Sequence, residues 1–314
     1  MNFPVFDLHC DTAHALLGED LRQFGSLKQN HYHIDLERAQ TFPGYAQCFA
    51  CFTTTEPAIL KGLKPYELFE RELAVLMREI GNNSDSVQQA FTHKDVIKNS
   101  NKGKMSAIFT IEGPAGFGYD PELLEDLYQV GFRITTLGWN EQNVLTGSCV
   151  TGGGLTDQGK AYMDEAQRLG ILVDVSHISD EGFWDIIKRT KKPIIATHSN
   201  SRAVYNVPRN LTDDMFRAIM ETGGTVGINL YSGFLGENAS VDTVCDHIFH
   251  FLELDPEGKH ISLGGDLDGI NKMPIGFTGI ENYCDLAGAL LNRGIEEEMV
   301  YNIFWNNALT VFSK

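Results

Sequence analysis

Eight short apolar runs alternate with amphipathic segments along the chain, and this alternation constrains the fold more than any other feature of the sequence. The runs are rich in Val, Ile, Phe and Thr, and they occupy residues 5–11, 46–52, 106–113, 132–139, 171–177, 193–199, 224–230 and 260–269. Near-continuous apolar runs of this length are typical of parallel strands buried on both faces. Eight such strands are the number that closes a (β/α)8 TIM-type barrel.

The segments between the runs have helical periodicity, and several carry start and stop signals. They occupy residues 65–80, 122–131, 155–170, 179–190, 211–223 and 241–254. Thr156 and Ser179 stand where N-caps belong, while Gly131, Gly170 and Gly223 follow the last periodic residue. The sequence therefore predicts an α/β fold. Two extra C-terminal helices, over 280–293 and 296–312, are expected to cover the outside of the barrel. The stretch 12–44 contains no clear long helix.

An open doubly wound sheet is the competing fold for an alternating α/β chain. That fold normally has a glycine-rich first turn that binds a phosphate, whereas the first turn here reads DLHCDTAHAL. The chain also has no linker rich in Pro, Gly or Ser and no repeat of fixed period. We therefore expect one barrel domain spanning residues 1–314.

The charge balance and the apolar pattern argue against several classes of partner. The 25 Lys and Arg residues face 42 Asp and Glu residues, a net charge of −17, so neither nucleic acid nor an anionic membrane is an expected partner. No apolar stretch approaches the ~18 residues of a membrane span. The first residues have no basic region and Asp7 interrupts their apolar run, so we expect no signal peptide and a cytoplasmic location.

Polar residues collect where the predicted strands end. They are His9, Asp11, Glu112, His177, His198 and Asp266. In a barrel of this type the active site lies at the C-terminal face of the strands, so these side chains should converge. Because strand side chains alternate, His9 and Asp11 should point one way and Cys10 the other.

Three imidazoles and three carboxylates in one pocket predict a metal site. Crowded carboxylates repel one another unless a cation is present, and imidazole with carboxylate suits Zn²⁺. The set exceeds the needs of one tetrahedral ion, which favours two ions that share a bridging carboxylate. Glu112 is the natural bridge, with His9 and Asp11 on one ion and His177 and His198 on the other.

Asp266 is left over from this ligand set, and we expect it to carry protons. A single histidine at a strand end is more commonly a hydrogen-bonded structural residue. A structural role, however, would not require every polar intrusion to fall at the same end of its strand.

Other candidate motifs favour structural interpretations. Cys48-x-x-Cys51 has no second cysteine pair and reads as buried strand, and the six cysteines do not suggest a disulfide scaffold. His247 and His250 lie three apart on a helical segment, where a helix surface is the simpler interpretation.

Five segments together resemble the membrane (renal-type) dipeptidases, zinc peptidases of the amidohydrolase-like barrel group. They are DLHCDT, TIEGPAGF, LVDVSHIS, IIATHSNSRAVYNVPRNLTDD and SLGGDLDG, in the family's order, and the likeness covers residues 4–312. It implies two Zn²⁺ ions per chain, with His9 and Asp11 on the first, Glu112 as the bridge, and His177 and His198 on the second.

The resemblance also implies roles for residues outside the ligand set. Arg209 matches the arginine that holds the substrate's C-terminal carboxylate, and Asp266 matches the acid that shuttles the proton. Tyr231 falls near the substrate pocket. The implied substrate is a dipeptide with a free C-terminal carboxylate, and a C-terminal D-residue is tolerated. A homodimer is common among such proteins.

One position departs from the family. Animal members have a histidine after the fourth strand that contacts the substrate, but TTLGWNEQN contains none. Trp139 and Asn140 stand at that place and become the candidate substrate contacts. Another binuclear amidohydrolase, acting on a cyclic amide or an N-acyl amino acid, is the alternative enzyme. A non-catalytic metal-binding barrel is the alternative outside catalysis.

Overall fold

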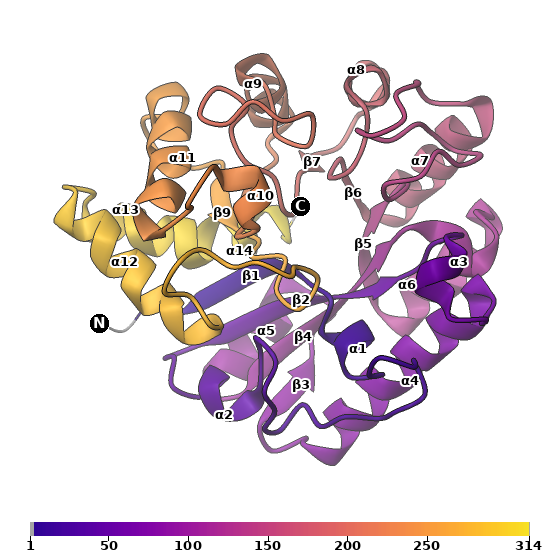
Figure 1. Ribbon diagram of the computed structural model, residues 1–314, viewed down its shortest axis with the longest axis horizontal. Helices are drawn as coiled ribbons and strands as arrows, with labels where there is room; N and C mark the ends of the chain where they lie inside the picture. The colour runs from indigo at the N-terminus through magenta and orange to yellow at the C-terminus, as the bar shows by residue number, and fades with distance from the viewer. Residues whose placement is uncertain (1–2, 314) are drawn as a thin grey trace.

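The computed structural model describes residues 3–313 and shows a ring of parallel strands surrounded by helices (Figure 1). The strands follow the order β7-β6-β5-β4-β2-β1-β9-β8, and a parallel bridge between Ala196 and Val226 joins the two ends. Their bounds are β1 Val5–Cys10, β2 Tyr45–Phe52, β4 Met105–Glu112, β5 Phe132–Thr136, β6 Leu172–Asp174, β7 Ile194–Ile195, β8 Val226–Ile228 and β9 Ile261–Leu263. The predicted barrel of eight parallel strands is confirmed.

A ninth strand lies outside this ring. β3, Val87–Gln89, pairs in parallel with β4. The sequence analysis missed it because the three residues VQQ contain no apolar run. It extends the sheet at the side of the barrel and contributes nothing to the strand ends.

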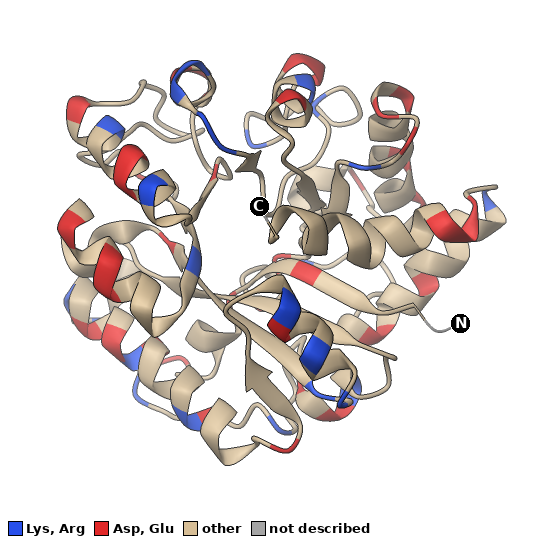
Figure 2. Cartoon of the chain, turned by 180° about the vertical axis from the view of Figure 1, so that it is seen from behind, with Lys and Arg blue, Asp and Glu red and all other residues tan. Residues whose placement is uncertain are grey.

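Most helices cover the outside of the ring, and the longer ones follow the predicted segments closely. The helices are α1 Thr12–Ala15, α2 Leu36–Ala39, α3 Pro57–Leu60, α4 Pro65–Asn82, α5 His93–Ser100, α6 Leu124–Val130, α7 Asp157–Leu169, α8 Asp180–Arg189, α9 Asp213–Thr222, α10 Ser232–Leu235, α11 Val241–Leu254, α12 Tyr283–Asn292, α13 Glu297–Tyr301 and α14 Asn307–Val311. The sequence did not predict α1, α2, α3, α5 or α10. Charged residues lie mainly on these helices and the loops (Figure 2).

The predicted caps are present. The Thr156 and Ser179 side chains accept the N–H groups of Gly159 and Gly182, at the starts of α7 and α8. Gly170 ends α7 with φ +85°, a left-handed conformation that costs glycine nothing. Among residues 3–313, no helix combines the length and apolar character that crossing a bilayer would require.

The C-terminal helices correct one expectation. α12 packs against α11, as a covering helix should. Trp305, Ala308 and Val311, from a π-helical turn at Asn302–Asn306 and from α14, instead join the apolar cluster inside the barrel. This segment closes one end of the ring, near the C-terminus marked in Figure 1. The apolar face of a helix predicts that the helix packs against another part of the protein, but it does not predict which part.

The interior cluster identifies the inward face of each strand. Phe6 and Leu8 of β1, Cys48 of β2 and Ile108 of β4 belong to it, together with residues of β5, β6 and β7. Side chains from so many strands can meet only inside the ring. Cys51 belongs to the outer core, so Cys48 and Cys51 face opposite sides and cannot form a pair.

Candidate metal centre

A bulge in β1 turns His9 toward the mouth of the barrel. The pairing of β1 with β2 shifts register between Asp7 and Cys10. Leu8 lies in the interior cluster, and Cys10 lies in the outer core. Regular alternation would have placed His9 on the outer face with Val5 and Asp7. The extra residue reverses this, and the Asp7 Oδ1 accepts the His9 N–H at 2.9 Å.

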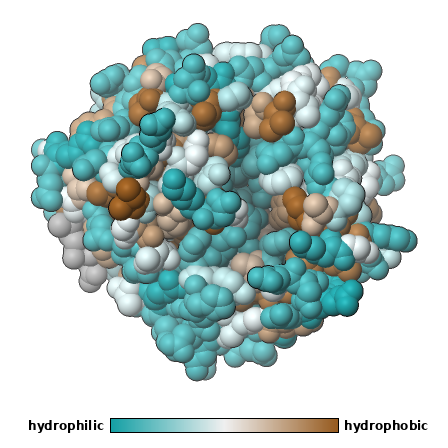
Figure 3. Space-filling view, in the orientation of Figure 1, coloured by the Kyte–Doolittle hydropathy of each residue, from teal (hydrophilic) through white to brown (hydrophobic). Residues whose placement is uncertain are grey.

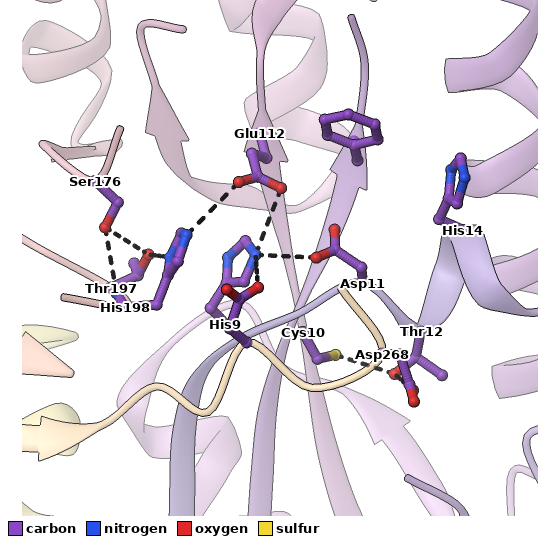
Figure 4. A network of polar contacts seen from close by, with 12 residues as sticks. His9, Cys10, Asp11, Thr12, His14, Glu112, Ser176, Thr197, His198 and Asp268 are labelled. Carbon is purple, nitrogen blue, oxygen red and sulfur yellow. Dashed lines mark hydrogen bonds and ion pairs between the residues drawn. The ribbon is translucent and has the colours of Figure 1, made fainter. Parts of the chain in front are cut away.

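His9 stands at the centre of a cluster of carboxylates. Its Nε2 lies 3.5 Å from Asp11 Oδ2, 3.5 Å from Glu112 Oε2 and 3.8 Å from Asp266 Oδ1. Figure 4 shows Glu112, at the end of β4, above the ring of His9. All four side chains are buried. The strand ends of β1, β4 and β9 therefore meet in one place, as the sequence predicted.

Two more imidazoles approach the other oxygen of Glu112. His177 Nε2 and His198 Nε2 lie 2.9 Å and 3.6 Å from Glu112 Oε1 and 2.9 Å from each other. The far nitrogens are already engaged: His177 Nδ1 with Asn140 Oδ1 at 2.9 Å, and His198 Nδ1 with Thr197 Oγ1 at 2.7 Å. Both Nε2 atoms therefore face a common point beside Glu112.

Burial favours the neutral form of both histidines of this second pair. Burial lowers the pKa of His177 and His198 well below the usual value, and the positive charge of Arg209 and His9 lowers both further. A neutral imidazole carries one proton. Asn140 Oδ1 is an acceptor, so the His177 proton lies on Nδ1. Its Nε2 then presents a lone pair toward Glu112.

Burial and mutual repulsion disfavour the charged form of the carboxylates. Burial raises the pKa of Glu112 to about 8, and the neighbouring Asp11 adds to the rise. Burial likewise raises the pKa of Asp266. Burial opposes the charged form of His9, but Glu112 and Asp11 outweigh it and raise the pKa of His9. Clustered anions of this kind are what a cation stabilises.

Unpartnered atoms test whether metal ions fit here. His9 Nε2 and Asp11 Oδ1 are buried and lack a hydrogen-bond partner, although both types of atom are good metal ligands. Two groups of ligand atoms, one of His9, Glu112 and His198 and one of His9, Asp11 and Asp266, each lie within 4.8 Å of one another. The donor set therefore fits divalent cations.

The structure does not separate Asp266 from the candidate ligands, as the sequence had done. The sequence reserved it for proton transfer, but one of its carboxylate oxygens belongs to the second group of ligand atoms. Its Oδ2 accepts a hydrogen bond from Asn229 Nδ2 at 2.9 Å, which leaves Oδ1 as the free oxygen on the side of His9.

Left-handed backbone occurs at two of these residues. His177 has φ +70° and Asp266 has φ +57°. Non-glycine residues in this region cost about 1–3 kcal/mol each, and they concentrate at functional sites. The strain is consistent with side chains whose direction matters more than the local backbone energy.

Arg209 lies beside the cluster with spare donors. It is buried, its Nη1 donates to Ser199 Oγ at 2.8 Å, and its Nε and Nη2 have no partner. The guanidinium lies 5.6 Å from the ring centre of Phe234. A planar fork with two free N–H groups is suited to a carboxylate.

A cavity of about 210 Å³ opens over the carboxylates. Its walls are formed by Asp11, Glu112, Trp139, Asn140, His177, Tyr231, Phe234, Asp266, Gly269, Ile270 and Asn271. Figure 3 shows the surface hollowed near the centre of the face seen in Figure 1. Trp139, Asn140 and Tyr231, the candidate substrate contacts, thus line the same cavity. Asn140 also orients His177, a role the sequence did not assign.

The sequence analysis missed the neutral residues that hold the site. Asn229 fixes Asp266, Thr197 fixes His198 and Ser199 fixes Arg209. Each follows a strand, so the criterion of polar residues at strand ends could have found them. None of the three is titratable, however, and only titratable residues were predicted from the strand ends. Phe234 has no such signal, because an aromatic residue in a helical segment usually indicates core.

The structure corrects one histidine expected on a helix surface. His247 is fully buried, where its Nε2 bonds the Leu235 carbonyl at 3.0 Å and its Nδ1 accepts the Ser201 N–H. Both ring nitrogens are satisfied by backbone, so the residue is structural, as expected, although it is not on the surface. His250 is partly exposed and pairs with Asp213.

Comparison with known proteins gives a consistent result. Residues 1–314 match the sequence profile of the membrane dipeptidases, peptidase family M19. An uncharacterized dipeptidase of Schizosaccharomyces pombe is 34% identical over 67% of this chain, and the match spans 53% of that protein. An uncharacterized protein of Klebsiella pneumoniae from the pqqA 5′ region is 30% identical over 79% of this chain and 96% of its own. The chain thus spans about half the length of the yeast relative.

Solved structures share the fold. A metallopeptidase from Rhodobacter sphaeroides, liganded with a phosphinate mimic of the dipeptide L-Ala-D-Ala, superposes with a TM-score of 0.89 at 24% identity over 99% of both chains. An amidohydrolase from Pseudomonas aeruginosa has a TM-score of 0.83 at 20% identity, over 99% of this chain and 95% of its own.

Proposed function

This chain belongs to the membrane dipeptidase family, peptidase family M19, and we propose that it is a metal-dependent dipeptidase whose substrates carry a free C-terminal carboxylate. One observation carries the proposal. Buried imidazoles and carboxylates converge beside Arg209, whose Nε and Nη2 have no partner. The cavity of about 210 Å³ is smaller than the ~300–1,000 Å³ of drug-sized sites, which suits a substrate of two residues.

The proposed cofactor is a pair of Zn²⁺ ions. His9 and Asp11 would hold one ion, His177 and His198 the other, and Glu112 would be shared by both. When bound, such ions supply an activated water and polarise the carbonyl of the scissile bond. Neutral imidazole is the form that ligates a metal, which agrees with the lowered pKa of His177 and His198.

Asp266 is the proposed proton carrier of the reaction. Its carboxylate takes a proton from the attacking water and returns it to the amine that leaves, so the water's oxygen joins the carbonyl carbon as the C–N bond breaks. Asn229 holds one oxygen of Asp266 and leaves the other directed at His9. This arrangement keeps the proton-accepting oxygen at the cluster.

Arg209 is the proposed clamp for the C-terminal carboxylate. A longer peptide would bring an uncharged amide to the two free N–H groups, so the clamp selects a substrate that ends one residue after the scissile bond. The dipeptide mimic in the Rhodobacter sphaeroides protein ends in D-Ala, which supports tolerance of a C-terminal D-residue here. Trp139, Asn140 and Tyr231 would line the walls that face the substrate.

The test combines metal analysis with a substrate panel. We expect about two Zn²⁺ per active chain and hydrolysis of dipeptides, with little turnover of cyclic amides or N-acyl amino acids. Arg209→Ala should raise KM for dipeptides by about tenfold or more and leave C-terminally amidated dipeptides little changed. Equal losses on both substrates would refute the clamp. A protein that binds no Zn²⁺ when the ion is supplied, and hydrolyses none of the panel, would refute the proposed function.

A further inference from the structure

A chain of buried hydrogen bonds runs from β6 to His198. Asp174, the last residue of β6, is 1% exposed, and its Oδ1 accepts two backbone N–H groups, from Ser176 at 2.8 Å and from Thr197 at 3.0 Å. Its Oδ2 bonds the hydroxyl of Thr197, which in turn bonds His198 Nδ1 at 2.7 Å. Figure 4 shows the Thr197 hydroxyl beside the ring of His198.

When Asp174 is a carboxylate, the donors and acceptors along this series of hydrogen bonds have one arrangement. A carboxylate has no proton to give, so the Thr197 O–H donates to Asp174. The Thr197 oxygen then accepts from His198, which places the imidazole proton on Nδ1. In the neutral imidazole, which is the form that binds a metal, Nε2 is then left as a lone pair directed at Glu112 Oε1.

We propose that Asp174 and Thr197 are positioning residues, which fix the tautomer of His198 so that Nε2 is free to bind a metal. The inference rests on the proposed metal centre and goes beyond it, because neither residue touches the ligand point. It parallels the general observation that the far nitrogen of a metal-binding histidine is fixed by a second partner.

The same pair ties two strand ends together. The Asp174 carboxylate links the backbone after β6 to the backbone after β7, one residue before His198. Ser176 Oγ adds a bond from the His198 N–H at 3.2 Å. The ring of His198 is therefore held at its backbone and at its Nδ1.

Asp174→Asn gives the most specific prediction, because it should reverse the donor and acceptor roles in this series of hydrogen bonds. The Asn oxygen can still accept the two backbone N–H groups, so its amide nitrogen faces Thr197 Oγ1. That nitrogen donates, so the Thr197 O–H loses its carboxylate acceptor and becomes available to donate to His198 Nδ1, and we expect the imidazole proton to move to Nε2. We expect Zn²⁺ affinity to fall by about 10–100-fold for at least one equivalent, measured by chelator competition on metal-free protein.

Three companion variants separate positioning from stability. Thr197→Val removes the hydroxyl and should weaken Zn²⁺ binding to a similar extent, whereas Thr197→Ser keeps the hydroxyl and should remain within about threefold of wild type. Thr225→Val is the matched control, because Thr225 is also buried next to a strand and bonds Ser262 Oγ at 2.8 Å. It should bind Zn²⁺ as wild type does.

Asp255→Asn is the control for the carboxylate change. Asp255 is buried and accepts the His260 N–H at 2.8 Å, away from the cluster. Thermal midpoints of the metal-free variants show whether each control loses as much stability as its partner. If the controls lose Zn²⁺ affinity as strongly as Asp174→Asn and Thr197→Val, the effect is one of general stability and the proposal is wrong.

Nitrogen NMR of ¹⁵N-histidine-labelled, metal-free wild type tests the tautomer with no variant at all. His198 should carry its proton on Nδ1 in wild type and on Nε2 in Asp174→Asn. A wild-type His198 protonated on Nε2 overturns the inference. A wild type that binds neither Zn²⁺ nor Co²⁺ overturns the proposed function instead. Wild-type metal affinity and an unchanged Co²⁺ spectrum in Thr197→Val overturn the inference alone.

Discussion

The proposed role of Asp266 can be tested by a single substitution. Asp266→Asn keeps the shape of the side chain and can keep one oxygen toward Asn229, but it cannot accept a proton. We expect turnover of dipeptides to fall by roughly a hundredfold or more, with metal content nearly unchanged, because general acid–base help is worth about 10²–10⁴-fold. Steady-state kinetics and metal analysis on the same preparation measure both.

The same variant discriminates a proton carrier from a ligand. Asp266 also belongs to a group of atoms that could hold a cation. Loss of one metal equivalent in Asp266→Asn would assign it to the ligands, and full turnover would remove it from the reaction.

A pair formed by the buried Glu72 and the partly exposed His14 has no part in the proposed chemistry. Glu72 of α4 bonds His14 Nδ1 at 2.8 Å through Oε1, and its Oε2 accepts the Phe52 N–H at 2.5 Å. Burial raises the pKa of Glu72 to about 7, although the bond from His14 opposes the rise. Burial opposes the charged form of His14, but Glu72 outweighs it and raises the pKa of His14.

The raised pKa values of Glu72 and His14 both make the free energy of unfolding fall as the pH rises. The folded state holds a proton on Glu72 that the unfolded chain releases above about pH 4.5. The contribution of Glu72 to the free energy of unfolding therefore falls between about pH 4.5 and about pH 7. The raised pKa of His14 stabilises the fold below about pH 6.5, and this contribution is lost above it. We predict that Glu72→Gln reduces the loss of urea midpoint between about pH 5.5 and about pH 7.5.

Glu79→Gln is the control for this pH effect. Glu79 is a buried glutamate of the same helix, but it pairs with Arg78, which stays charged, and accepts the Leu27 N–H. It should lower the midpoint at both pH values by a similar amount. An equal pH difference in wild type and Glu72→Gln would contradict the prediction.

At the scale of the element, glycines permit the close approach of the strands near His198. A Cβ added to Gly264, after β9, would lie 1.7 Å from the Thr197 carbonyl oxygen, and one added to Gly227 of β8 would lie 2.0 Å from it. Backbone cannot move away as a flexible side chain can. These two glycines therefore let β8 and β9 close against the end of β7.

Gly264→Ala should accordingly lower the free energy of unfolding by about 2–3 kcal/mol or more. Gly288→Ala is the matched control: it lies in the middle of α12 with nothing within 4 Å of its added Cβ. That change should raise the free energy of unfolding by about 0.5–1 kcal/mol, because alanine favours helix. Urea denaturation compares the two, and a harmless Gly264→Ala would contradict this account of barrel closure.

Elements differ in how far the sequence predicted them. Thr156 and Ser179 cap α7 and α8 as expected, because a cap depends on a few neighbouring residues. β3 was missed, and the β1 bulge was not foreseen, because both depend on pairing with a strand far along the chain. The direction of His9 relative to Asp11 and Cys10 was nevertheless predicted correctly, since His9 Nε2 lies 3.5 Å from Asp11 Oδ2 and Cys10 belongs to the outer core.

At the scale of the whole molecule, metal removal should destabilise the fold. A ligand that binds only the folded state adds about 2.7 kcal/mol at a free concentration 100 times its Kd. We predict that chelation lowers the thermal midpoint and that added Zn²⁺ restores it, as measured by calorimetry. Arg209→Ala, which keeps every proposed ligand, should respond as wild type does. An unchanged midpoint in a protein shown to contain metal would contradict the prediction.

The sequence by itself determined the eight parallel strands, most of the helices, and the set of imidazoles and carboxylates that meet at one end of the barrel. These follow from local periodicity and from the rule that parallel strands end at the same face. Tertiary structure alone decided which atoms face one another: the bulge that turns His9 inward, the closing of the barrel by Trp305, and the bonds from Thr197 and Asn140 to the histidines. The reason is physical. The register of a strand, the segment that closes the barrel and the direction of a hydrogen bond all depend on residues far apart in the sequence, and a local sequence pattern does not specify which of them meet.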